Sequence, residues 1–156
     1  MNRQRRTFLN KAVSIASWSF AAAYGWLPSA SAKTLWTADK FAAGNLDIAL
    51  KALFGNKSLT ESEQIELKIP LIAENGAIVP VTVSSSLTNV QKLYLLVEKN
   101  PVPLAAQFDF SPDLDIFVSA RIKMAETCNV VAIAETDQGL FSKKQLVKVT
   151  IGGCGG

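Results

Sequence analysis

The chain has 156 residues, of which 16 are Lys or Arg and 13 are Asp or Glu, and it contains no histidine. The absence of histidine excludes Ser-His-Asp and Cys-His catalysis, and any zinc or haem bound through histidine of this chain. Two cysteines are also too few for a four-cysteine zinc site or an iron–sulfur cluster. The sequence therefore predicts one domain without a resident metal or cofactor.

Residues 1–32 are predicted to be a removable export signal. They hold four basic and no acidic residues, an apolar stretch at 12–27, and a small-x-small cleavage signature at 30–32. The apolar stretch has 16 residues, whereas a membrane span needs about 20. An N-terminal membrane anchor is therefore the weaker alternative.

Arg5 and Arg6, followed by Phe8 and Leu9, resemble a twin-arginine signal, which exports proteins that are already folded. Such cargo holds a cofactor or travels with a partner, and the sequence contains no cofactor motif. We therefore expect the chain to fold with a partner and to enter the periplasm with it. Without the signal, 12 basic and 13 acidic residues remain, which gives no broad electrostatic reason to bind nucleic acid or an anionic membrane.

The first element predicted in the mature chain is a helix over residues 45–54, with a possible earlier start near Thr37. Its apolar residues recur at the spacing of one helix face: Leu46, Ala49, Leu50 and Leu53. Asn45 can cap the start of this helix, and Gly55 lies where a terminating glycine is expected.

From residue 62 onward, alternation of apolar and polar residues predicts strands. The segments 65–73 and 77–83 flank Asn75-Gly76, which predicts a two-residue hairpin with apolar Leu71 on its inner face. Pro70 and Pro80 predict a sheet edge or bulges there. Further strands are expected at 93–97, 104–110, 116–124, 128–136 and 140–151, with 128–136 central because neither of its faces is polar.

About seven strands, with turns every 8 to 12 residues, predict an immunoglobulin-like antiparallel β-sandwich preceded by one short helix. A small barrel is the alternative, because the cysteine pair and tryptophan typical of antibody domains are missing. The predicted organisation is a signal at 1–32, a β domain at 33–151 and a glycine-rich tail at 152–156.

Chemistry is expected in this tail, where Cys154 lies between Gly152-Gly153 and Gly155-Gly156. Glycine pairs give a flexible tether with no side chains near the sulfur, and they place Cys154 roughly 10 Å beyond Ile151 when extended. A free cysteine thiol has a pKa near 8.5, and no basic residue lies close enough to Cys154 in the sequence to lower it. A mobile thiol without local activation predicts a carrier rather than an enzyme; an incidental cysteine on a frayed terminus is the alternative.

Cys128 differs, because a lone cysteine at the start of a central strand is typically a small buried apolar residue. Its alternative role is a disulfide with Cys154 in a thiol-disulfide redox protein. A further alternative is a β-sandwich that binds a partner or metal ion, with the tail as a docking peptide.

The ending VKVTIGGCGG, residues 147–156, resembles the C-terminal signature of the SoxY family, the sulfur-carrier subunits of the periplasmic sulfur-oxidising (Sox) system. The resemblance implies that Cys154 carries the sulfur, and that a c-type cytochrome attaches thiosulfate sulfur to it oxidatively as a thiosulfonate. A dimanganese hydrolase would then release sulfate, and a sulfane dehydrogenase would oxidise the remaining sulfur. The resemblance also implies a heterodimer with a SoxZ-like β-sandwich subunit that lacks its own signal. Cys128 is not part of this signature.

Overall fold

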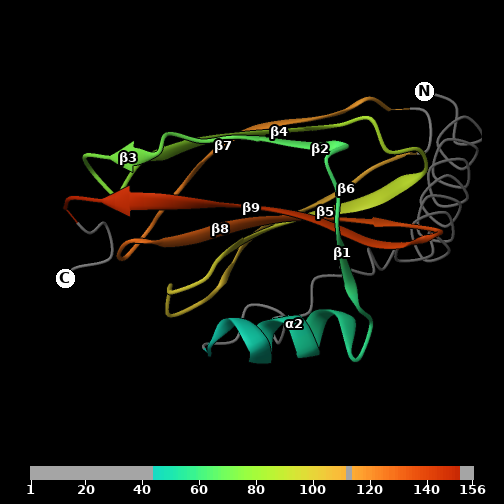
Figure 1. The fold of residues 1–156 in the computed structure, drawn as a ribbon, viewed down its shortest axis with the longest axis horizontal. Helices are drawn as coiled ribbons and strands as arrows, with labels where there is room; N and C mark the ends of the chain where they lie inside the picture. The colour runs from blue at the N-terminus through green and yellow to red at the C-terminus, as the bar shows by residue number, and fades with distance from the viewer. Residues whose placement is uncertain (1–43, 112–113, 152–156) are drawn as a thin grey trace, which may run out of the picture. The chain divides into compact units, whose positions relative to one another are not determined.

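The computed structural model describes residues 44–111 and 114–151, all within the unit Trp36–Gly156 of the chain. The export signal, the segment before residue 44 and the tail at 152–156 lie outside this description. The predicted domain boundaries therefore stay predictions, as does a helix start near Thr37. Within the described ranges, the chain forms one helix and nine strands (Figure 1).

Helix α2 spans Leu46–Phe54, as the apolar spacing predicts. The side chain of Asn45 accepts a hydrogen bond of 2.9 Å from the Ile48 backbone N–H, which satisfies one of the free donors at the helix start. Gly55 follows the helix with φ 64°, a conformation that glycine adopts without strain, and its N–H bonds to the Lys51 carbonyl. Both predicted ends of the helix are confirmed.

The strands form two sheets, and the prediction of an antiparallel β-sandwich is confirmed. The larger sheet has the order β1-β9-β8-β5-β6, with β3 also paired to β9; the smaller has the order β2-β4-β7. Among the strands of the described part of the chain, only β1 and β3 run parallel to a neighbour, and that neighbour is β9 for both. The strand bounds are β1 Leu59–Glu61, β2 Ile65–Lys68, β3 Ile72–Ala73, β4 Val79–Ser85, β5 Val90–Val97, β6 Leu104–Asp109, β7 Ile116–Ile122, β8 Cys128–Thr136 and β9 Gly139–Val149.

The main core lies between the two sheets, and the inner residues of β4, β5, β7, β8 and β9 contribute to it. Alternation along β7 is confirmed: Ile116, Val118 and Ile122 are buried, whereas Phe117 and Ser119 are exposed. Strand β8 lies between β5 and β9, which confirms its central position. The barrel alternative is not what the chain adopts.

A second apolar cluster fills the space between α2 and the outer face of the larger sheet. Phe54 of the helix packs edge-to-face on Tyr94 of β5, with ring centroids 4.9 Å apart. Leu96 and Ile133 are fully buried in this cluster. Burial on both faces of β5 and β8 explains why their sequences are almost continuously apolar, and α2 therefore serves as the cover of one sheet.

The predicted two-residue hairpin at Asn75-Gly76 is wrong. Strand β2 ends at Lys68, after which the chain crosses to the other sheet and β3 pairs with Lys148 and Val149 of β9. The crossing begins at Ile69-Pro70, because proline lacks the N–H that would continue the ladder. Leu71, predicted to face inward, is consequently exposed.

Pro80 lies in β4, the middle strand of the smaller sheet, and not in an edge strand. The β2 ladder reaches β4 only at residues 82–85, whereas β7 pairs along the whole of β4. Pro80 therefore occupies a stretch that has a neighbour on one side only, and its missing N–H breaks no ladder bond to β2.

Candidate functional site

The residues predicted to carry the chemistry, Cys154 and the glycines Gly152, Gly153, Gly155 and Gly156, lie outside the described residues, as do Arg5 and Arg6 of the signal. The structure does describe the chain up to Ile151, three residues before Cys154. We call residues 148–151 the tail root. The candidate site is therefore built from the contacts that hold the tail root in place.

Strand β3 holds one edge of the tail root (Figure 1). The Lys148 N–H donates to the Leu71 carbonyl at 2.9 Å, and the Thr150 N–H donates to the Ala73 carbonyl at 3.0 Å. The Thr150 hydroxyl adds a bond of 2.8 Å to the Glu74 carbonyl. Three hydrogen bonds along four residues fix the direction in which the chain leaves the domain.

The Asn75-Gly76 turn joins the tail root to the smaller sheet. The buried Gly76 donates its N–H to the Ile151 carbonyl at 2.8 Å, and its carbonyl accepts the Met124 N–H at 2.7 Å. The Asn75 side chain closes the turn by accepting the Ala77 N–H at 2.8 Å. The turn signal in the sequence is therefore real, but it anchors the C-terminal strand and does not connect two neighbouring strands.

Thr127 holds the tail root from the side of β8. Its hydroxyl lies 2.9 Å from the Val149 nitrogen, from which it accepts a hydrogen bond. The same hydroxyl lies 3.5 Å from the Val149 carbonyl oxygen. Segments that precede β4, follow β7 and precede β8 thus all meet at the last described residues.

Cys128 begins β8 directly beside this region, in register with Val147 of β9. It is 2% exposed and belongs to the core between the sheets, as predicted. Burial raises the pKa of the Cys128 thiol, because a thiolate would lose its hydration there; the backbone of Lys99 opposes this effect only in part. The thiol is therefore kept protonated and away from solvent, which suits a structural residue.

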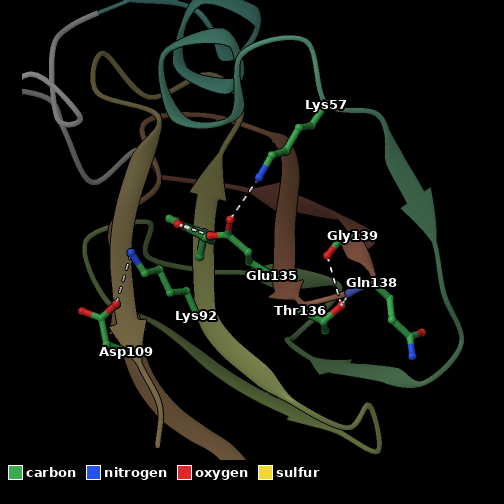
Figure 2. Close-up of polar contacts among 8 residues, drawn as sticks. Lys57, Lys92, Asp109, Glu135, Thr136, Gln138 and Gly139 are labelled. Atoms are coloured by element: carbon green, nitrogen blue, oxygen red, sulfur yellow. Dashed lines mark hydrogen bonds and ion pairs between the residues drawn. The ribbon is translucent and has the colours of Figure 1, made fainter. Parts of the chain in front are cut away.

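A group of polar contacts at the opposite end of β9 was not predicted. The Tyr94 hydroxyl donates to Glu135 at 2.8 Å. Lys57 lies 3.5 Å from the same carboxylate (Figure 2). Burial, reinforced by the Glu135 carboxylate, raises the pKa of Tyr94 well above its ordinary value, so the phenol stays a donor. These contacts join the segment after α2 to the sheet across 78 residues of sequence, which local patterns cannot reveal.

Two hollows also lie away from the tail root. One of about 190 Å³ is lined by Asn89, Phe110 and Asp137, and a more open one by Glu63, Glu66 and residues 84–86. Within 44–111 and 114–151, no group of three or more acidic or cysteine side chains could hold a metal ion. In the same ranges, no helix has the length and apolar character needed to cross a membrane.

Fold and site together define a class: a β-sandwich protein whose final strand is anchored on several sides and continues into a short cysteine-bearing segment. A family model described as "Sulfur oxidation protein SoxY" matches residues 50–154, a range that includes Cys154. The chain belongs to the SoxY family, and its role lies in sulfur oxidation.

Solved structures agree with this family. The sulfur carrier protein SoxY from Chlorobium limicola f thiosulfatophilum is 39% identical, with a TM-score of 0.62 over 74% of this chain and 100% of that one. The superoxide reductase (neelaredoxin) from Ignicoccus hospitalis is 18% identical, with a TM-score of 0.47 over 56% of this chain and 80% of that one, which is too distant to support an argument. No curated protein matched the sequence.

Proposed function

We propose that this protein carries sulfur intermediates covalently on Cys154 during the periplasmic oxidation of thiosulfate. The observation that carries the proposal is the family match, which runs through the tail to Cys154. In this role the protein is the substrate-bearing subunit on which enzymes act, and it is not itself an enzyme. Its only prosthetic chemistry is the sulfur adduct on Cys154.

The loading step forms one sulfur–sulfur bond. The Cys154 thiol loses its proton and joins the outer sulfur of thiosulfate, and the two electrons released pass to a c-type cytochrome partner. Hydrolysis by a dimanganese partner then cleaves the bond between the outer sulfur and the sulfonate group, which leaves as sulfate and leaves a persulfide on Cys154. A sulfane dehydrogenase oxidises this remaining sulfur in turn.

The anchored tail root supports the proposal. A carrier must present its thiol to several active sites, and a fixed starting point confines Cys154 to a sphere of roughly 10 Å around Ile151. Confinement raises the local concentration of the thiol at an enzyme docked nearby. The domain thereby limits the positions that Cys154 can occupy.

The burial of Cys128 also supports a carrier over a thiol-disulfide redox protein. A disulfide with Cys154 would require the Cys128 sulfur, now 2% exposed between two sheets, to reach the surface. Repacking of the core would accompany each redox cycle. A carrier with one accessible thiol needs no such change.

Partners follow from the same proposal. A SoxZ-like β-sandwich subunit forms the heterodimer, and the pair leaves the cytoplasm through the signal that contains Arg5 and Arg6. Replacing both arginines with lysine should therefore stop export of the pair, which immunoblotting of periplasmic and cytoplasmic fractions would measure. Unchanged export would contradict the twin-arginine route.

Paired cysteine variants test the function itself. Cys154→Ser should abolish thiosulfate oxidation by cells while leaving the unfolding midpoint of the protein unchanged. Cys128→Ala should keep the activity and lower stability by about 1 kcal/mol, because it removes a buried sulfur. Continued oxidation with Cys154→Ser would refute the carrier; loss of activity in a folded Cys128→Ala protein would favour the redox alternative.

A further inference from the structure

Exposed apolar side chains gather around the tail root. Of the eight large apolar side chains that are exposed within the described ranges, five lie there, with exposed fractions between 49% and 69%. We call these five residues the collar: Leu71, Ile72, Ile78, Leu146 and Ile151. Exposed apolar surface gathered in one region indicates a contact surface for another molecule.

Backbone pairing places the collar beside the exit of the chain. Ile72 is in register with Lys148, and it therefore shares a sheet face with Leu146, two residues earlier on β9. The Leu71 carbonyl accepts the Lys148 N–H, so Leu71 also lies beside Lys148. Leu71, Ile72 and Leu146 of the collar therefore lie where β3 pairs with the end of β9.

Ile78 and Ile151 complete the collar on the side of the Asn75-Gly76 turn. Gly76 is bonded to Ile151, and the Ile78 N–H bonds to the Asn75 carbonyl at 3.4 Å. Ile151 is the last described residue, and its side chain is 69% exposed. The apolar residues therefore lie on more than one side of the point from which the tail departs.

The short tail requires any protein that acts on Cys154 to lie close to the collar. Cys154 is three residues beyond Ile151, so its Cα lies at most about 10 Å from that of Ile151. A protein that admits the Cys154 thiol to an active site must bring its entrance within this distance. Its outer surface then necessarily covers residues next to Ile151.

We propose that the collar is the docking surface for the enzymes that act on Cys154, each with an apolar rim around a narrow active-site entrance. This inference rests on the proposed carrier function. Exposed Lys144 and Lys148 flank Leu146 on the same face of β9, so acidic residues outside the rim would match them. Successive enzymes need the same thiol and therefore use the same collar.

A permanently bound subunit fits this position less well. It would stand within about 10 Å of the thiol and obstruct each enzyme that has to reach it. The same holds for a second copy of the chain. The collar is therefore assigned to transient partners, and the permanent subunit is expected on another face.

Single-residue variants with a matched control test the proposal. Ile72→Asp and Leu146→Asp each place a charge in the collar, and Phe117→Asp places one at an apolar residue that is even more exposed, on the outer face of the smaller sheet. All three sites are exposed, so folding is expected to change by only about 0.5 kcal/mol. The mature chain is purified with its subunit, and the rate of thiosulfate-dependent mass gain on Cys154 is measured in periplasmic extract from source cells that lack this chain.

Both collar variants should load at least about tenfold more slowly, as expected when a central apolar contact is replaced by a charge. Phe117→Asp should load at the wild-type rate, and N-ethylmaleimide should label Cys154 equally fast in all four proteins. Equal loading of collar variants and wild type would overturn the docking surface. Loss of the subunit from the collar variants in native mass spectrometry would overturn it too, and would assign the collar to the subunit. A wild-type protein that gains no mass at all would instead refute the carrier function.

Discussion

At its first residues, strand β9 pairs with β1 and lies among side-chain contacts. Its last residues are held by backbone bonds and by the Thr127 and Thr150 hydroxyls, and exposed apolar side chains lie around them. The Thr136 hydroxyl bonds to the Gly139 carbonyl at 3.2 Å (Figure 2), and the preceding residue, Glu135, accepts a bond from the Tyr94 hydroxyl. At the other end, β3 and the Asn75-Gly76 turn bond to the backbone of the tail root. We call the first residues of β9, near Gly139, its closed end, and the tail root its open end.

The two ends of β9 differ in role: the contacts at its start stabilise the fold, whereas the exposed residues at its end are available to other proteins. Side-chain contacts at the start of β9 join α2 to the sheet and leave little apolar surface uncovered. The hydrogen bonds at the end hold the chain but leave the side chains of the collar exposed. Perturbing the start should therefore cost stability alone, while perturbing the surface of the end should cost function alone.

The largest expected effect tests whether the tail root rests on the core. Val147 is fully buried between the sheets beside Cys128, so Val147→Asp places an unpaired charge there and should destabilise the fold by about 3–5 kcal/mol. Lys148→Asp, one residue later on the exposed face, should change stability by only about 0.5 kcal/mol. Urea unfolding measures both, and similar losses would show that the end of β9 is not built on this core.

The next effect concerns the closed end. Tyr94→Phe keeps the ring that packs on Phe54 but removes the bond to the Glu135 carboxylate, and it should cost about 1.5–3 kcal/mol at neutral pH. Sulfur loading of Cys154 should be unaffected. A loss of loading in a folded Tyr94→Phe protein would contradict the claim that the start of β9 affects stability alone.

The same residue predicts a dependence on pH. The raised pKa of Tyr94 means that its contribution to stability is complete below about pH 10 and falls as the pH rises further, because the unfolded phenol ionises first. Wild-type stability should therefore decline more steeply above about pH 10 than that of Tyr94→Phe. Burial raises the pKa of Cys128 in both proteins, so this effect cancels in the comparison. Parallel declines would contradict a buried, protonated Tyr94.

The smallest expected effect concerns the tail root. Thr150→Val removes the hydroxyl bond to the Glu74 carbonyl, a loss of about 0.5–1.5 kcal/mol that should remain local. Hydrogen exchange at the amides of Thr150 and Gly76 should become about two- to tenfold faster. Thr60→Val makes the same change on exposed β1 at the other end of β9 and should leave these amides unchanged. Equal exchange in both variants would show that the hydroxyl does not hold the tail root.

Local patterns predicted the elements whose causes are local. The helix over residues 46–54 follows from its apolar spacing and from Asn45 and Gly55 at its ends. Strand β7 follows from strict alternation, and central β8 from its apolar run. About seven strands were predicted; residues 44–111 and 114–151 form nine, because β1 is added and the segment 65–73 is divided into β2 and β3.

What the sequence could not reveal depends on pairing between distant segments. Strand β3 has two residues, and its position is fixed by β9, more than 70 residues later. The Asn75-Gly76 signal is the same for a hairpin and for the anchor found here, because both need the same backbone turn. The collar could not be predicted for the same reason. Leu71 was predicted to face inward, and it is exposed because the chain crosses between the sheets.

Of the two cysteines, Cys154 is proposed to carry the sulfur and Cys128 is not. Protein purified from cells oxidising thiosulfate, digested without reducing agent and analysed by mass spectrometry, tests it most directly. We expect thiosulfonate and persulfide adducts on the C-terminal peptide with Cys154, and an unmodified Cys128. Adducts on Cys128, or a disulfide between the two cysteines as the main species, would contradict it.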